Sequence, residues 1–368
     1  MNNSTRSTTL IELLIQRAEN RPDKIAYRFL KDGETEATSL TYAQLDRRAR
    51  ATAVRFQRIA TLGERALLLY PPGLEFIAAF FGCLYAGVVA VPTYPPRRNR
   101  SDPRFHAIAT DARASLVATT AAILSDREAF PQGISGLGEL SWLATDDPAS
   151  DAAETWQMPD ILGDTLALLQ YTSGSTETPK GVMVSHKNLM HNLEYIKRGS
   201  ELGASDTGVF WLPAYHDMGL INGIINPVYI GMRNILMAPT AFLQRPVRWL
   251  RAIACYQATY SGGPNFAYDL CVGKIKIEDC KDLDLSHWRC AFNGAEPIRK
   301  ETLDRFADRF KSYGFRREYF YPCYGLAEVT VAASGGFAAA APVVFNADED
   351  RLKYHLRSGY LWALPSDL

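Results

Sequence analysis

The chain has 368 residues, enough for one large domain or two smaller ones with a sizeable buried core. Forty basic residues balance forty acidic residues, and 47% of all residues are hydrophobic, which is typical of a globular protein. The zero formal net charge gives no support to a protein that binds nucleic acid or an anionic membrane surface mainly through charge.

The cysteines and the N-terminus favour a cytoplasmic protein. Six cysteines are scattered without Cys-x-x-Cys spacing, and the six histidines do not cluster near them, so we expect reduced, mostly buried thiols and no zinc site. Residues Met1 to Thr9 lack the order of a signal peptide. The apolar run Phe76–Val91 is short for a membrane span and contains two glycines, so we expect a core helix followed by a buried strand and no transmembrane segment.

The first part of the chain alternates helical and extended patterns. Apolar spacing predicts helices over Leu10–Asn20 and from Tyr42 to Val54, then from Phe76 onward, and extended segments over Lys24–Phe29, Ala66–Tyr70 and Val88–Val91. Strand, helix and strand at this spacing predict a parallel sheet covered by helices.

The same alternation continues along the chain. Strands are predicted over Ser115–Ala118, Thr207–Leu212 and Asn234–Met237, and helices over Lys187–Lys197 and Arg245–Tyr256. Two polar stretches are interpreted as surface connections: Pro95–Arg100, a basic turn, and Pro131–Glu154, which is rich in Gly, Ser, Asp and Pro.

The polar run from Tyr171 to Gly181 is the strongest functional signal. It holds five Ser or Thr hydroxyls, two glycines and Lys180 between the apolar segments Leu166–Leu169 and Val182–Val184, which we expect to be two buried strands. Glycines let the backbone approach a ligand, hydroxyls and amides donate hydrogen bonds, and the lysine adds positive charge, so the loop suits phosphate. Its order differs from the Walker A pattern, and a solvated turn is the alternative interpretation.

Four further segments place polar and aromatic residues at predicted strand ends and turns. They are Trp211–Leu220, with a histidine and an aspartate after a strand; Ser261–Phe266, interpreted as a glycine-rich turn before a helix; Asn293–Pro297, after an extended apolar lead; and Tyr321–Glu328. In open α/β sheets, ligands bind beyond the carboxyl ends of the strands. These segments are therefore candidates for one binding site.

Taken singly, these residues also fit structural roles: His216 as a hydrogen-bonded core residue, Glu328 as a helix cap, Trp211 and Tyr324 as core aromatics. In this order and at these separations, however, the segments resemble the motifs of adenylate-forming enzymes. The sequences of three segments are similar to those of the fatty acyl-AMP ligases: Trp211–Leu220, Phe242–Pro246 and Ser261–Cys271. The resemblance covers roughly residues 10 to 345.

The resemblance implies an α/β fold, the large N-terminal domain of the adenylate-forming enzymes, with helix-covered mixed and parallel sheets over residues 10–345. It implies that the carboxylate of a medium- or long-chain fatty acid attacks the α-phosphorus of ATP, that pyrophosphate leaves, and that the acyl group passes to an acyl carrier protein. ATP and Mg²⁺ would be the cofactors. Positioning and charge neutralisation would be the main work of the polypeptide.

The resemblance also implies roles for single residues. The catalytic residues would be His216, beside the substrate carboxylate, Lys180 and Glu328, with Glu328 and Thr176 near the metal. The nucleotide would be held by Thr172, Ser173, Gly174, Ser175, Thr176 and Lys180 at its phosphates and by Gly294, Ala295, Glu296, Tyr324 and Gly325 around adenine. The acyl chain would lie among Trp211, Met218, Ile221, Gly262, Gly263 and Phe266.

Two departures from the family pattern limit the expected activity. Glu177 occupies a loop position where the family has a small or neutral residue, and an exposed carboxylate there would repel bound triphosphate by about 1 kcal/mol unless it points into water. Family members continue into a small C-terminal domain with a catalytic lysine, whereas residues 346–368 show no such pattern. We therefore expect nucleotide binding with little or no turnover; the alternatives are a fragment of a fatty acyl-CoA synthetase or an inert nucleotide-binding fragment.

Overall fold

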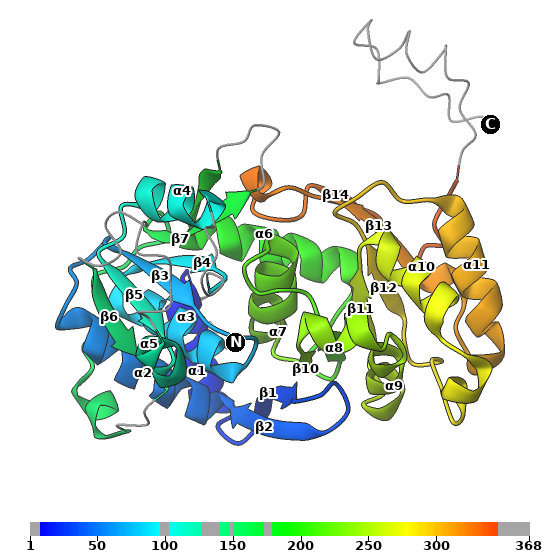
Figure 1. Cartoon of the computed structure of the whole chain (residues 1–368), viewed down its shortest axis with the longest axis horizontal. Helices are drawn as coiled ribbons and strands as arrows, with labels where there is room; N and C mark the ends of the chain where they lie inside the picture. The colour runs from blue at the N-terminus through cyan, green and yellow to red at the C-terminus, as the bar shows by residue number, and fades with distance from the viewer. Residues whose placement is uncertain (1–7, 96–102, 127–139, 147–149, 173–178, 345–368) are drawn as a thin grey trace, which may run out of the picture.

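The computed structural model describes residues 8–95, 103–126, 140–146, 150–172 and 179–344, which form two sheets enclosed by helices (Figure 1). Both sheets are largely parallel with antiparallel strands at their edges, which confirms the predicted mixed, helix-covered α/β domain.

The first sheet has six strands in the order β6-β5-β3-β4-β7-β8. They are β3 (Arg65–Leu69), β4 (Val89–Thr93), β5 (Leu116–Thr119), β6 (Ser141–Ala144), β7 (Leu166–Thr172) and β8 (Lys180–Ser185). Only β8 runs antiparallel, pairing with β7 so that Thr172 lies opposite Lys180. The two strands form a hairpin whose connecting loop includes residues 173–178, which lie outside the described part of the chain.

The second sheet has eight strands in the order β14-β13-β12-β11-β9-β10-β1-β2. They are β1 (Ile25–Leu30), β2 (Glu36–Thr41), β9 (Thr207–Phe210), β10 (Arg233–Met237), β11 (Tyr260–Gly263), β12 (Cys290–Asn293), β13 (Phe320–Tyr324) and β14 (Ser334–Gly335). The six inner strands are parallel, so their carboxyl ends meet at one edge of the sheet.

Helices connect the strands and cover both sheets (Figure 1). The α-helices are α1 (Leu10–Asn20), α2 (Tyr42–Gln57), α3 (Leu74–Ala86), α4 (Pro103–Ala112), α5 (Ala121–Ser125), α6 (His186–Ser200), α7 (Asn226–Ile230), α8 (Pro239–Gln244), α9 (Val247–Cys255), α10 (Asn265–Lys274) and α11 (Lys300–Phe310); η4 (Met218–Ile225) is π-helical. Within the described ranges, no helix combines the length and apolarity that a membrane span requires.

Local sequence explains where the main helices begin. The side chains of Thr9, Thr41 and Ser185 each accept a hydrogen bond from the backbone N–H three residues on, and the side chain at that third position accepts one from the backbone N–H of the cap residue. These capping boxes satisfy backbone donors that a helix start leaves free. At the start of α6, the fully buried His186 accepts a hydrogen bond through Nδ1 from the Leu10 amide of α1, 3.4 Å away.

The prediction for the apolar run at 76–91 is confirmed. Every residue of α3 except Glu75 is buried, and β4 follows it as a fully buried strand. The turn between them requires Gly87, whose φ of +72° suits a residue without a side chain. The prediction that most cysteines are buried is also confirmed: four of the six are buried, Cys323 is half-buried and Cys255 is exposed.

Three predictions were wrong in part. Of the predicted turn Ser261–Phe266, residues 261–263 belong to the buried strand β11 (Tyr260–Gly263); glycine is needed at 262 because a side chain there would overlap the Phe292 carbonyl oxygen of the adjacent strand. The 131–154 connection contains β6, which extends the sheet beside β5. In β8, Val184 is buried but Met183 is 72% exposed, since β8 is an edge strand.

Candidate functional site

A cavity of about 450 Å³ lies where the carboxyl ends of strands from the two sheets meet. From the six-stranded sheet, Gln170 and Thr172 of β7 line it; from the eight-stranded sheet come the segment after β9, residues of β12 and β13, and the loops that follow them. Helices α4, α6 and η4 contribute further lining residues. The cavity therefore occupies the position where open α/β sheets bind ligands.

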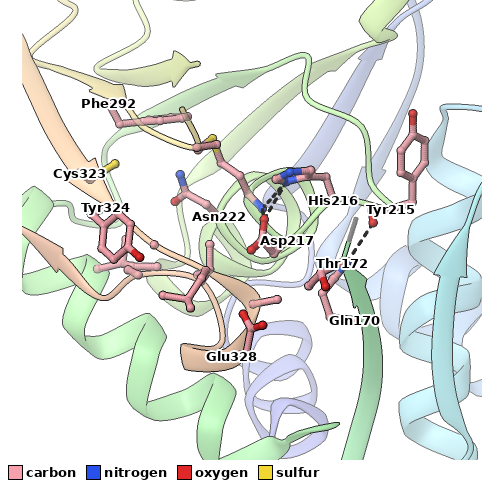
Figure 2. A pocket seen from close by; sticks show the side chains of 18 of the residues that line it. Gln170, Thr172, Tyr215, His216, Asp217, Asn222, Phe292, Cys323, Tyr324 and Glu328 are labelled. Atoms are coloured by element: carbon pink, nitrogen blue, oxygen red, sulfur yellow. Dashed lines mark hydrogen bonds and ion pairs between the residues drawn. The ribbon is translucent and has the colours of Figure 1, made fainter. Parts of the chain in front are cut away.

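His216 and Asp217 lie together at the wall of the cavity (Figure 2). His216 Nδ1 is 2.7 Å from Asp217 Oδ1, and we place a proton on Nδ1 because the carboxylate can only accept. This hydrogen bond raises the pKa of His216, while partial burial and the nearby Arg104 act in the opposite direction. The side chain is 53% exposed, so its second nitrogen is available to a ligand.

The loop that carries His216 is held by close packing and backbone hydrogen bonds. The His216 amide donates to the Pro213 carbonyl at 3.1 Å, and the Leu220 amide donates to the His216 carbonyl at 2.8 Å. A side chain at position 219 would overlap the Pro213 carbonyl oxygen, so only glycine lets the loop lie against η4. Wide π-helical turns are frequent at functional sites, and this one presents Met218 and Asn222 to the cavity.

Opposite this wall, the end of β13 places Tyr324 at the cavity, and the segment after the strand places Glu328 there (Figure 2). The Tyr324 side chain is 63% exposed, and Glu328 is exposed in the short helix Ala327–Val329. Thr330 ends that helix at φ +81°, and Ala295, which lines the cavity, has φ +69°. Positive φ at a β-branched residue is a strained geometry, and such strain concentrates at functional sites.

Seven of the sequence-predicted site residues line one cavity: Thr172, His216, Met218, Ala295, Tyr324, Gly325 and Glu328. Ser173, Gly174, Ser175 and Thr176 lie outside the described residues, and Lys180, at the start of β8, is exposed beyond the lining. Gly294 follows β12 with its backbone against Cys323, and Glu296 accepts a hydrogen bond from the Phe266 amide at 2.6 Å.

The residues assigned to the acyl pocket separate into two groups. Met218 lines the cavity, whereas Ile221 is fully buried in the core behind it. The other four residues do not line the cavity: Trp211, Gly262, Gly263 and Phe266. The Trp211 ring stacks on the Phe242 ring with centroids 4.0 Å apart and meets the Phe266 ring edge-on at 6.1 Å.

Several cavity residues were missed by the sequence reasoning. Gln170 donates to the Tyr215 carbonyl at 2.9 Å, and its buried Oε1 has no partner in the described part of the chain. Arg104 of α4 brings a cation to the cavity, and Tyr260 and Asn222 form its inner end. Gln170 and Asn222 each interrupt an apolar run, a signal that a polar side chain is needed inside; Arg104 follows residues with no clear periodicity and gave no signal.

The sequence profile described as AMP-binding enzyme matches residues 14–355. The medium-chain-fatty-acid–[acyl-carrier-protein] ligase JamA of Moorena producens (strain JHB) is 49% identical over 331 residues, which are 89% of this chain and 56% of JamA. The long-chain-fatty-acid–AMP ligase FadD23 of Mycobacterium tuberculosis (strain CDC 1551 / Oshkosh) is 37% identical over 92% of this chain and 59% of its own.

A solved structure is similar over the same extent. The crystal structure of a fatty acyl-adenylate ligase from L. pneumophila, in complex with acyl adenylate and pyrophosphate, superposes with a TM-score of 0.86 at 43% identity, covering 91% of this chain and 58% of that one. The chain thus spans between one half and two thirds of the length of each of these three proteins.

Proposed function

The chain belongs to the AMP-binding enzyme family, and on that premise we propose that its cavity binds ATP beside a fatty acid and joins them as an acyl-adenylate, with release of pyrophosphate. One observation carries this proposal: the cavity gathers His216, the Tyr324–Glu328 segment and the end of the β7–β8 hairpin from three separate parts of the chain. A histidine, an aromatic ring and a carboxylate around one polar mouth suit a nucleotide and a carboxylic acid.

The nucleotide end of the proposed site is the mouth of the cavity. Tyr324 offers an exposed ring on which adenine can stack, beside the backbone of Ala295 and Gly325. Thr172 and Lys180, paired across the hairpin, would face the phosphates with a hydroxyl and an ammonium group. The hairpin loop of Ser173 to Thr176 would add further donors.

The reacting end is proposed to lie at His216. Asp217 holds the ring and favours its protonated form, so the second nitrogen can donate to the fatty-acid carboxylate and orient it. One carboxylate oxygen attacks the α-phosphorus and forms the new C–O–P link, while the bond from that phosphorus to the bridging oxygen breaks and its electron pair leaves with pyrophosphate. Arg104, in the same cavity, would neutralise negative charge at this centre.

Glu328 and Thr176 are the proposed metal-side residues. Among the described residues, no group of three His, Cys, Asp or Glu could cage an ion by itself. A lone carboxylate fits Mg²⁺, which keeps several waters and binds through one or two carboxylates together with substrate phosphates. Bound there, Mg²⁺ would neutralise charge on the triphosphate.

An acyl carrier protein is the proposed acceptor of the acyl group. The support is the similarity to JamA, a medium-chain-fatty-acid–[acyl-carrier-protein] ligase. Transfer to coenzyme A, as in a fatty acyl-CoA synthetase, is the alternative. Mixing the acyl-adenylate with this chain and either holo-carrier protein or coenzyme A, and then identifying the thioester by mass spectrometry, separates the two.

Nucleotide binding is tested by thermal unfolding of the 368-residue chain with and without MgATP. A ligand that binds only the folded state adds about 2.7 kcal/mol at a concentration one hundred times its Kd, which raises the melting temperature by a few degrees. Tyr324→Ala should abolish this rise without lowering the melting temperature of the free protein. Ile277→Ala, an equally exposed apolar truncation away from the cavity, should keep the rise.

A chain that shows no rise with MgATP contradicts the proposal and supports an inert fragment. If the rise is present, formation of acyl-adenylate from labelled ATP and a fatty acid measures turnover. The Glu177 question is answered by the same assay: Glu177→Gly leaves ATP affinity unchanged if the carboxylate points into water and tightens it if the carboxylate faces the phosphates.

A further inference from the structure

The inner end of the cavity is polar, although apolar and aromatic side chains surround it. Tyr260 is the first residue of β11, and its hydroxyl donates to Asn222 Oδ1 at 2.6 Å. Asn226 Nδ2 donates to the same oxygen at 3.3 Å. Asn222 and Tyr260 line the cavity (Figure 2 shows Asn222).

These two bonds fix which way the Asn222 amide faces. Its oxygen receives both protons, so the NH₂ group is the part left to meet the cavity. Within the described ranges that NH₂ group donates no hydrogen bond, and its nitrogen is open to the cavity although Asn222 as a whole is only 7% exposed. An alkyl chain that displaces water from this donor leaves it buried without a partner, which is costly, whereas a ligand atom that accepts from it avoids that cost.

The surroundings exclude a charged partner. The rings of Phe292 and Phe210 lie 5.2 and 5.7 Å from the Tyr260 ring. Burial raises the pKa of Cys323 to about 12, so its thiol is neutral, and the described residues at this end contribute no cation. A carboxylate would lose its hydration here without a counter-charge, whereas a neutral carbonyl or hydroxyl oxygen would not.

We propose that the Asn222 amide, oriented by Tyr260 and Asn226, is a subsite for a neutral oxygen on the acyl chain, so that the cavity favours hydroxy- or oxo-fatty acids over plain ones. This inference rests on the proposed function, because it assumes that the acyl chain runs from His216 toward Tyr260. A plain alkyl chain leaves the amide protons unpaired, which we expect to weaken binding by about tenfold or more.

The test uses the full chain with Mg²⁺ and a non-hydrolysable ATP analogue, and measures the Kd of octanoic acid and of octanoic acids that carry one oxo or hydroxyl group at successive carbons from the third outward. The expected result is one position at which the oxygenated acid binds about tenfold tighter than octanoic acid. Asn222→Leu should reduce this ratio to about one while octanoic acid still binds.

Two tyrosine variants provide a matched comparison. Tyr260→Phe removes the hydroxyl that holds the amide and should reduce the ratio. Tyr268→Phe removes a buried hydroxyl that donates to the Phe292 carbonyl at 2.7 Å outside the cavity, and should leave the ratio unchanged. Because Tyr260→Phe removes a single oxygen, it keeps the test valid if Asn222→Leu does not fold.

The outcomes separate this inference from the proposed function. If octanoic acid binds as tightly as every oxygenated acid, or if the ratio survives in Asn222→Leu or Tyr260→Phe, the subsite is disproved and the proposed function stands. If no acid binds although MgATP raises the melting temperature, the subsite and the proposed fatty-acid activity both fail. If neither ligand binds, the whole proposal fails.

Discussion

The two faces of strands β9, β11 and β12 perform different tasks. On one face, alternate residues pack into an aromatic core together with residues of helices α8 to α11. On the other face, the intervening residues belong to a second apolar core, which includes residues of α1 to α3 and borders the cavity. The aromatic core receives Val209, Ser261 and Ala291. The other face carries their chain neighbours Phe210, Tyr260 and Phe292. Because side chains alternate along a strand, one short segment builds both a sealed core and a binding surface.

Hydrogen bonding differs between the two faces. In the aromatic core, Trp249 Nε1 donates to Ser261 Oγ at 2.8 Å and Trp288 Nε1 donates to the Ser261 carbonyl at 3.2 Å; Trp211 Nε1 is an exception. At the cavity, the buried Oε1 of Gln170 has no partner among the described residues, and the Asn222 NH₂ group donates no hydrogen bond there. Two of the three indole N–H groups of the core are thus paired within the protein, whereas the cavity presents polar groups that a bound ligand can pair.

The largest expected effect is on the sealed face. Trp249→Ala empties the centre of the aromatic core, where the fully buried ring contacts Trp211, Phe242, Tyr268 and Trp288. We expect the free energy of unfolding to fall by about 3–5 kcal/mol, measured by urea denaturation. MgATP should still raise the melting temperature of the folded variant; a loss of less than 1 kcal/mol would contradict the sealed-core description.

A smaller effect is expected at Gly262 of strand β11, whose backbone serves both faces. Gly262→Ala places a methyl group against the Phe292 carbonyl oxygen and ring, and should cost about 1–3 kcal/mol of unfolding free energy while displacing Phe292 toward the cavity. The matched control is Gly273→Ala in α10, where the added methyl group meets open space, and it should stabilise the protein by up to about 1 kcal/mol. Equal effects of the two changes would show that β11 tolerates a side chain.

The smallest expected effect belongs to the cavity face and depends on pH. Asp217 raises the pKa of His216 above its unfolded value of about 6.5, so their interaction stabilises the fold below that pH and is lost as the pH rises through the folded pKa. Asp217→Asn should therefore lower the melting temperature more at pH 5.5 than at pH 9. It should also lower the His216 pKa in an NMR titration; an unchanged pKa would mean that Asp217 does not hold the ring. The half-exposed ring keeps the effect small.

Local periodicity predicted most of the fold. The helical spacing at Leu10–Asn20 and the continuous apolar run at 66–70 appear as α1 and β3, and the helix and strand at 76–91 appear as α3 and β4. These signals are strong because the apolar pattern within each element directly reflects which of its side chains are buried. Seven predicted site residues meet at the cavity because their motifs follow strands whose carboxyl ends share an edge.

The misses have physical reasons. In Tyr260–Gly263, glycine is required by the neighbouring Phe292 of another strand, so a pattern typical of a turn marks a close approach instead. Exposure of Met183 depends on β8 being last in its sheet, which no local pattern specifies. The polar role of Asn222 depends on Tyr260, 38 residues away, and pairings of this kind arise only in the folded chain.

The hydrogen bond between Leu10 and His186 has a consequence in mild acid. Burial lowers the pKa of His186 to about 4, so the folded state excludes a proton that the unfolded state accepts below about pH 6.5, and stability falls as the pH drops from there toward 4. Protonation also removes the acceptor for the Leu10 amide. The free energy of unfolding, measured with urea, should therefore be smaller at pH 4.5 than at pH 7.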